Sequence, residues 1–253
     1  MQIYQEITDF TMSYIDTEHQ FETYKTLING MNYVYGMDVQ GDIAEFGTMT
    51  GRTAVALSVS LRRLEEKYGP IDPRGGKKIW FFDSFEGLQT SKSSVDINCP
   101  HVRAEIWRPG TCKGLNLDEF NNLISQILEP KQFSVIEGWY ENTMANLDDQ
   151  KFSLVHIDCD LYESTIQVLE ELFSKNRVTP GCIIFFDDWN CNHASNSFGE
   201  RKAWLDTVSK YNVVYSDCGD YGVASKKFII HSYGKNGLRG TGKSMRHNVS
   251  VSA

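Results

Sequence analysis

The stretch "GDIAEFGTMTGRTAVAL" (residues 41–57) contains a buried strand, a glycine turn and a helix in direct succession, which is typical of an α/β fold. Residues 41–46 form the strand, and apolar residues recur at helical spacing after the turn. Gly47 and Gly51 frame a turn whose backbone a ligand can approach closely. The first N–H groups of the following helix are free to bind that ligand. A plain strand-to-helix turn without a ligand is the alternative.

The same alternation of strand and helix continues along the chain. Further strands are expected in "KKIWFFD" (77–83), "FSVIEG" (133–138), "FSLVHID" (152–158) and "GCIIFFDD" (181–188). Two closing strands, in "YNVVYSD" and "KKFIIHS", are joined too tightly for a helical crossover, so one of them should be antiparallel. The pattern predicts a doubly wound, mostly parallel sheet with helices on both faces. Ligands of such sheets bind at the carboxyl ends of the strands.

The length of 253 residues is compatible with one large domain, and we expect a single domain over residues 1–253. Residues 1–35 have a mainly helical pattern and predict an N-terminal helical cap. Residues 84–115 are long and polar for a connection, which indicates a lid or an acceptor-binding insertion. Residues 235–253 are expected to form a flexible tail.

Charge and composition exclude several classes of protein. A formal net charge of −8 argues against a nucleic-acid partner, because phosphate binding usually needs a basic surface. No apolar run has the roughly 18–20 residues that a membrane-spanning helix requires, and the first ten residues do not resemble a signal peptide. The six cysteines are scattered, which disfavours disulfides and a structural zinc site. We therefore expect a cytoplasmic protein.

Polar and aromatic residues at two strand ends indicate a nucleotide-like ligand. Asp83 ends the second strand, where an acid can accept hydrogen bonds from ribose hydroxyls; capping of a helix is the alternative. Gly138 and Trp139 end the third strand, where the indole could form one wall of an adenine slot. A tryptophan that only fills the core is the other interpretation.

Acidic residues gather at the ends of the next two strands. Asp158 ends one strand, Asp187 and Asp188 end its expected neighbour, and Asp160 lies nearby. Adjacent strands are roughly 4.8 Å apart, so the carboxylates should repel one another unless a cation offsets their charge. Ligation by oxygen alone suits Mg²⁺, Mn²⁺ or Ca²⁺. Capping of the next segment is the weaker alternative, since it needs only one acid.

The motifs together identify a family. "AEFGTMTGRTA", "FDSFEGL", "EGWYENT", "HIDCDLYEST" and "FFDDW" occur in an order that resembles the macrocin O-methyltransferase (TylF/MycF-type) family of S-adenosylmethionine-dependent enzymes. The resemblance spans about residues 22–210. It implies the seven-stranded, Rossmann-like sheet of class I methyltransferases, with the last strand antiparallel. The family also has a bulky residue where Met49 stands.

The resemblance also implies residue roles. The methionine part of S-adenosylmethionine would be held by Glu45, Gly47 and Thr48, the ribose by Asp83 with Ser84, and the adenine by Gly138 and Trp139. We place Gly51 and Asp158 among the cofactor-binding residues as well. The implied ligands of Mg²⁺ (or Mn²⁺) are Asp158, Asp187 and Asp188.

Family members methylate sugar hydroxyls, so the implied acceptor is a sugar, a nucleotide-linked sugar or a related small molecule. A bound cation lowers the pKa of such a hydroxyl and orients it. Asp158 would act in catalysis through that cation. Asp160 is the first candidate for the general base, and His231, which ends the last strand, is the second. His156 lies in mid-strand and is expected to be a core residue.

Two other classes of function remain open at this point. A nucleotide-sugar oxidoreductase or epimerase could use a similar sheet, although it would not need the Asp187–Asp188 pair. A non-catalytic partner protein could have kept the fold, although an intact acidic cluster argues against it. The sequence fixes neither the acceptor nor whether the chain forms a homo-oligomer.

Overall fold

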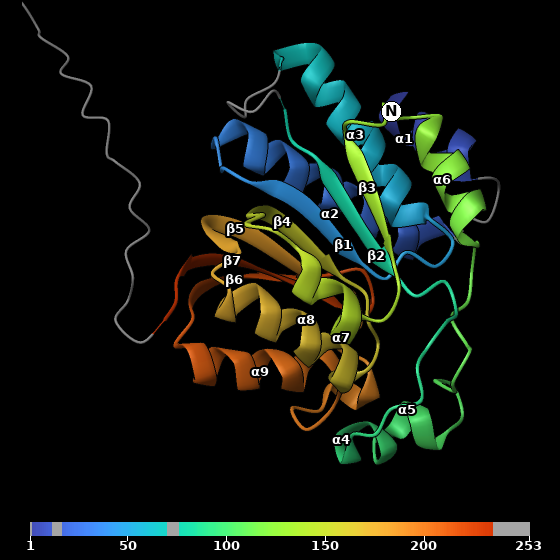
Figure 1. Ribbon diagram of the computed structural model, residues 1–253, viewed down its shortest axis with the longest axis vertical. Coiled ribbons are helices and arrows are strands. Elements are labelled where there is room, and N and C mark those ends of the chain that lie inside the picture. Colours follow the sequence, from blue (N-terminus) through green and yellow to red (C-terminus); the bar gives the residue numbers. More distant parts are fainter. Residues whose placement is uncertain (1, 12–16, 70–75, 235–253) are drawn as a thin grey trace, which may run out of the picture.

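A computed structural model describes residues 2–11, 17–69 and 76–234 (Figure 1). A seven-stranded sheet runs through the centre in the order β3-β2-β1-β4-β5-β7-β6. The strands are β1 (Asp42–Phe46), β2 (Ile79–Asp83), β3 (Phe133–Glu137), β4 (Phe152–Ile157), β5 (Val178–Phe186), β6 (Val214–Tyr221) and β7 (Ser225–Ser232).

The pairing of the strands confirms the predicted class I methyltransferase sheet. β1 pairs in parallel with β2 and β4, and the parallel pairing continues to β3 on one side and to β5 on the other. β7 is antiparallel to both β5 and β6. The order reverses between β1 and β4, which is the switch point where doubly wound sheets bind ligands.

Nine α-helices occur within the described ranges. They are α1 (Gln2–Thr11), α2 (Thr17–Gly36), α3 (Arg52–Tyr68), α4 (Ser94–Ile97), α5 (Pro100–Arg103), α6 (Leu117–Ser125), α7 (Tyr140–Thr143), α8 (Tyr162–Ser174) and α9 (Gly199–Tyr211). Two short 3₁₀ turns are η1 (Met144–Asn146) and η2 (Asn192–Ala194). A capping box begins α6, because Asn116 accepts from the Glu119 amide and Glu119 accepts from the Asn116 amide.

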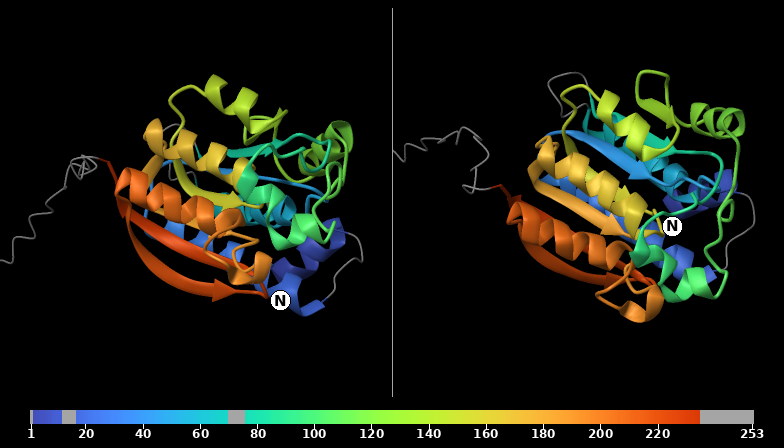
Figure 2. Two further views of the ribbon diagram at one scale, coloured as in Figure 1. Left: turned by 90° about the horizontal axis from the view of Figure 1, so that it is seen from below. Right: turned by 60° about the horizontal axis from the view of Figure 1, so that its bottom comes forward.

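The helices form two layers on opposite faces of the sheet (Figures 1 and 2). Apolar residues of α2, α3 and α6 pack on one face, and those of α8 and α9 pack on the other. Every residue of β1 and β4 is buried, so neither strand alternates between buried and exposed positions. The two buried cores fix the central strands, and with them the strand ends that carry the site.

Residues 84–115 contain only the short helices α4 and α5, which lie on the side of the sheet where the parallel strands end (Figure 1). Asp96 anchors this segment, because its fully buried carboxylate accepts from the Tyr162 and Glu163 amides at 2.7 and 3.0 Å. Trp107 is also buried, in a small apolar cluster with Cys99 and Leu161. The segment is thus packed onto the first turn of α8.

Within the described ranges, no helix combines the length and the apolar character that crossing a lipid bilayer would require. The predicted tail, 235–253, lies outside the described residues.

Candidate functional site

A cavity of about 280 Å³ lies at the carboxyl ends of β1, β2, β4 and β5. Two groups of residues that the sequence predicted as site residues line this cavity, and we call them the glycine side and the acidic side. The glycine side comprises residues 47–50, Asp83 and Gly138, and the acidic side comprises Asp158, Asp160 and Asp188. Gly51, which was also expected to bind the cofactor, does not line the cavity. Both sides border one cavity, as the strand-end pattern predicts.

Gly47 joins the two sides at the switch point. Its φ of 89° is strained for other residues. A Cβ at this position would lie 1.9 Å from the carbonyl oxygen of Asp158, so only glycine lets the turn pass the end of β4. Gly51 also has a positive φ, 77°, and it caps α3 without a side-chain hydrogen bond. The sequence signal at these glycines therefore has a steric cause.

Asp83 organises the glycine side. Its Oδ2 accepts hydrogen bonds from the Thr48 amide (2.7 Å), the Thr48 hydroxyl (2.9 Å) and the Met49 amide (3.2 Å). Its Oδ1 accepts from the Phe85 amide at 2.7 Å. A carboxylate oxygen has two lone pairs, so Oδ1 retains room for one further donor. Asp83 thus ties the turn to β2 and can still bind a ligand hydroxyl.

Gly138 and Trp139 also lie on the cavity wall. Gly138 has a φ of 128° and donates its amide to the Asp83 carbonyl at 2.9 Å, which joins the ends of β2 and β3. Trp139 precedes α7 and is half-buried. Ser84 lies on the same wall, where its hydroxyl donates to the Gly87 carbonyl at 3.2 Å.

Glu45 lies behind the glycine turn, and its carboxylate is completely buried. Its Oε1 is 2.9 Å from Nδ1 of His156, which is also fully buried. Burial lowers the pKa of His156, but the hydrogen bond and the charge of Glu45 outweigh that effect and the net pKa is raised. Among the described residues, Oε2 of Glu45 and Nε2 of His156 have no hydrogen-bond partner. The expected core histidine is therefore half of a buried pair.

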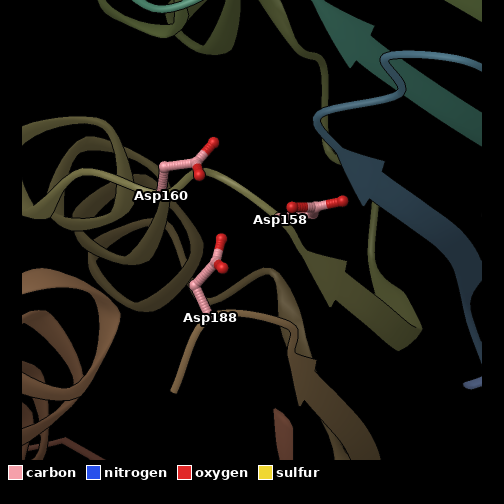
Figure 3. A group of neighbouring side chains, drawn as sticks. All are labelled: Asp158, Asp160 and Asp188. Atoms are coloured by element: carbon pink, nitrogen blue, oxygen red, sulfur yellow. The ribbon is translucent and has the colours of Figure 1, made fainter. Parts of the chain in front are cut away.

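The acidic side brings three carboxylates together at the ends of β4 and β5 (Figure 3). Oxygen atoms of Asp158, Asp160 and Asp188 all lie within 4.8 Å of one another. Burial and the neighbouring acids raise the pKa of Asp158 and of Asp160 well above the ordinary range. Burial and Asp187 raise the pKa of Asp188 to about 6. Such hard oxygen donors fit Mg²⁺ or Mn²⁺, which would offset the repulsion.

Asp187 differs in placement from the predicted ligand set. It lies on the cavity wall, but its Oδ1 accepts from the Ser225 hydroxyl at 3.1 Å and it is not part of the closest group. Successive residues leaving a strand point in different directions, so two adjacent acids do not automatically face one ion. Asp160, which was expected only nearby, completes the group instead.

His231 is not near this group. β7 is antiparallel to β5, and Lys226 at its start pairs with Phe186, just before the acids. His231 lies near the other end of β7, beyond the pairing of Ile229 with Ile183, and contacts the Ser216 hydroxyl at 2.8 Å. The second candidate for the base was therefore wrong, because an antiparallel strand ends beside the amino ends of the parallel strands and not beside their carboxyl ends.

Sequence reasoning missed Glu200, in the first turn of α9. Its side chain is fully buried, and it accepts from the Cys159 amide at 3.1 Å and from the Asp188 amide at 3.0 Å. An acid in the first turn of a helix is common on protein surfaces. The sequence therefore gave no sign that this acid would point inward. Helix α2 and the segment 84–115 also contribute to the cavity wall, with Thr23, Tyr24, Leu88, Gln89 and Cys112.

The sheet order and the cavity at its switch point define a class I methyltransferase fold. Two solved structures share it. The O-methyltransferase NovP aligns with a TM-score of 0.66 at 17% identity, over 90% of this chain and 88% of that one. The calicheamicin methyltransferase CalS11 aligns with a TM-score of 0.60 at 22% identity, over 90% and 91%.

The chain belongs to the macrocin-O-methyltransferase (TylF) family, which matches residues 20–211. A 4'-O-methyltransferase from Streptomyces olivaceus, acting on 8-demethyl-8-(2,3-dimethoxy-alpha-L-rhamnosyl)-tetracenomycin-C, is 25% identical over 187 residues, or 68% of this chain and 63% of the relative. Demethyldecarbamoylnovobiocin O-methyltransferase from Streptomyces niveus is 23% identical over 186 residues, or 73% and 66%. The match thus covers slightly less than two thirds of these relatives.

Proposed function

We propose that the protein is an S-adenosylmethionine-dependent O-methyltransferase that needs a divalent cation and acts on a hydroxyl of a sugar or sugar-bearing small molecule. The observation that carries the proposal is the cavity in which the glycine side and the acidic side face one space. Membership of the TylF family and relatives named as O-methyltransferases support the reaction. The rhamnosyl group in one relative's name supports a sugar acceptor.

The glycine side fits the cofactor. Gly47 lets the turn pass close to the end of β4 and borders the cavity, and the free acceptor position on Asp83 suits a ribose hydroxyl. Trp139 supplies a flat wall next to Gly138 for an adenine ring. Glu45 would act from behind the turn, because its buried carboxylate does not reach the cavity wall.

The acidic side fits the cation and the acceptor hydroxyl. Bound S-adenosylmethionine would supply the methyl group, and bound Mg²⁺ or Mn²⁺ would make the hydroxyl more acidic. Asp158 and Asp188 would hold the cation with Asp160 beside them, while Asp187, whose Oδ1 accepts from Ser225, would contribute only its Oδ2. Asp160 would accept the hydroxyl proton, because it lies on the same cavity wall as the proposed ligands of the cation that would hold that hydroxyl.

The segment 84–115 would exclude water from the reaction. Leu88, Gln89 and Cys112 line the cavity from this segment, and Gln89 donates to the Ser164 hydroxyl at 3.2 Å. Cover of this kind strengthens the electrostatic interactions inside a site. The segment is therefore our candidate for the lid, and its side chains should influence the choice of acceptor.

A release assay tests the proposed function. The protein would be incubated with S-adenosylmethionine, Mg²⁺ and a panel of nucleotide-linked deoxysugars and rhamnosylated natural products, and S-adenosylhomocysteine would be measured with and without EDTA. We expect release with at least one acceptor and its loss in EDTA. Calorimetric binding of NADH together with no binding of S-adenosylhomocysteine would favour an oxidoreductase instead.

A further inference from the structure

Glu200 contacts both strand ends that carry the acidic side. β4 and β5 pair up to the hydrogen bond from the Asp187 amide to the Ile157 carbonyl, at 3.0 Å. Beyond this point the two chains separate, and Glu200 bridges them. Its Oε1 accepts from the Cys159 amide and its Oε2 from the Asp188 amide. The Glu200 side chain therefore links the two chains where the next backbone hydrogen bond of the sheet would otherwise lie.

This double contact suits a carboxylate, because each of its two oxygens accepts from one backbone N–H group. A glutamine in the same position would turn its NH₂ group toward one of the two donors. Keeping a charge here is costly, because Glu200 is fully buried. The acid offsets this cost by accepting hydrogen bonds from two buried amides that would otherwise lack a partner.

The start of α9 holds the surrounding loops as well. A Cβ on Gly199 would lie 3.5 Å from the Asp160 carbonyl oxygen, so the helix begins directly against the loop that follows β4. Arg201 donates to the Ala194 carbonyl at 2.6 Å and to the Asn190 side chain at 2.5 Å, which fixes the loop after β5. The first turn of α9 thus contacts both loops of the acidic side.

We infer that Glu200 is a positioning residue that sets the spacing of Asp158 and Asp160 relative to Asp188 and thereby the affinity of the acidic side for a divalent cation. Glu200 contacts the backbone of both strand ends and does not line the cavity, so it acts through these loops and not as a ligand. The inference rests on the proposed function, since it presumes that the acidic side binds a cation. Residues that orient metal ligands typically change metal affinity about 10–100-fold when they are replaced.

The test compares Glu200→Gln with Glu171→Gln. Glu171 is a partly buried acid whose ion pair with Arg177 lies at the far end of α8, at 3.1 Å. Mn²⁺ binding would be measured by electron paramagnetic resonance, and S-adenosylhomocysteine binding by calorimetry. We expect Glu200→Gln to weaken Mn²⁺ binding about 10–100-fold and to leave cofactor binding within about twofold, the margin we set for an unchanged site. Glu171→Gln should keep Mn²⁺ affinity even if its stability falls.

A second measurement needs no variant. In the metal-free wild type, the amides of Cys159 and Asp188 should exchange slowly with solvent, because Glu200 accepts from both. Rapid exchange at both amides would overturn the inference, and so would unchanged Mn²⁺ affinity in a folded Glu200→Gln protein. Those results would leave the methyltransferase proposal intact. A wild type that binds no Mn²⁺ would instead remove the cation site and this inference with it.

Discussion

The acids on the two sides of the cavity differ in their partners: one is hydrogen-bonded to the chain, and the others lie beside further acids. On the glycine side, Asp83 accepts four hydrogen bonds from its own chain and is satisfied without a ligand. On the acidic side, oxygen atoms of three carboxylates lie within 4.8 Å of one another, and burial together with neighbouring acids raises the pKa of Asp158 and of Asp160. The glycine side is therefore held by the chain's own hydrogen bonds, whereas the acidic side contains a repulsion that the proposed cation would offset. Mutations should separate the two.

The largest effect is expected at Asp160. Asp160→Asn keeps the shape of the side chain but removes the proposed base, so methyl transfer should fall by about 10²–10⁴-fold. S-adenosylhomocysteine affinity should stay near the wild-type value, because Asp160 makes no contact with the glycine turn in the described structure. The S-adenosylhomocysteine release assay and calorimetry would check both. Full turnover in the variant would assign the base elsewhere.

A smaller effect is expected from Asp83→Ala, which alters the opposite side. The change removes the anchor of the Thr48 and Met49 amides together with the proposed ribose contact. Each lost hydrogen bond to a charged group costs about 1.5–3 kcal/mol, so cofactor affinity should fall at least about tenfold. Calorimetric titration with S-adenosylhomocysteine measures this. Unchanged affinity would show that Asp83 serves the turn alone.

The effect of Asp188→Asn on stability should depend on pH. Burial and Asp187 raise the pKa of Asp188 to about 6, above the ordinary value of about 3.9. The folded protein then holds this proton more tightly than the unfolded chain, so its stability falls as pH rises from about 4 to above 6. In EDTA the variant should be more stable than the wild type by about 1–3 kcal/mol at pH 7.5, and the gap should shrink toward pH 4.5.

Urea unfolding at the two pH values measures that difference. The same acids predict that Mn²⁺ stabilises the wild type more at pH 7.5 than at pH 5, since the ligands must lose their protons to bind. If Asp188→Asn were less stable than the wild type in EDTA at pH 7.5, other groups of the protein would already offset the repulsion among the acids.

No effect is expected at His231. The residue is exposed and lies at the opposite edge of the sheet, where it contacts Ser216. His231→Gln should leave methyl transfer and both binding affinities within error of the wild type. A large loss of turnover would mean that the last strand contributes to the site in a way that the geometry does not explain.

The sequence predicted the sheet and the cavity well, because buried parallel strands are apolar and their polar ends meet at one edge. It predicted less about the direction of individual side chains. Asp160 faces the acidic group from a left-handed backbone conformation, with a φ of 58°. No neighbouring glycine or proline in the sequence indicates this conformation. Glu200 reaches the site from a position 42 residues after Asp158, in the first turn of α9, and its sequence context matches that of an ordinary surface acid.

The error at His231 has a different origin. The tight closing turn already indicated an antiparallel strand, and the end of such a strand cannot lie at the carboxyl edge of the others. The placement of Asp187 toward Ser225 depends on β7, a partner far away in the sequence. Chain direction could therefore be derived from the sequence, whereas contacts between distant elements could not.

The most direct test of the two-sided cavity is a pair of calorimetric titrations, with S-adenosylhomocysteine and with Mn²⁺, on the wild type, Asp83→Ala and Asp188→Asn. The wild type should bind both ligands. Asp83→Ala should lose most of its affinity for S-adenosylhomocysteine and retain Mn²⁺ binding, and Asp188→Asn should do the reverse. A wild type that binds no Mn²⁺, or two folded variants that each lose both ligands, would contradict the separation of the cavity into a cofactor side and a cation side.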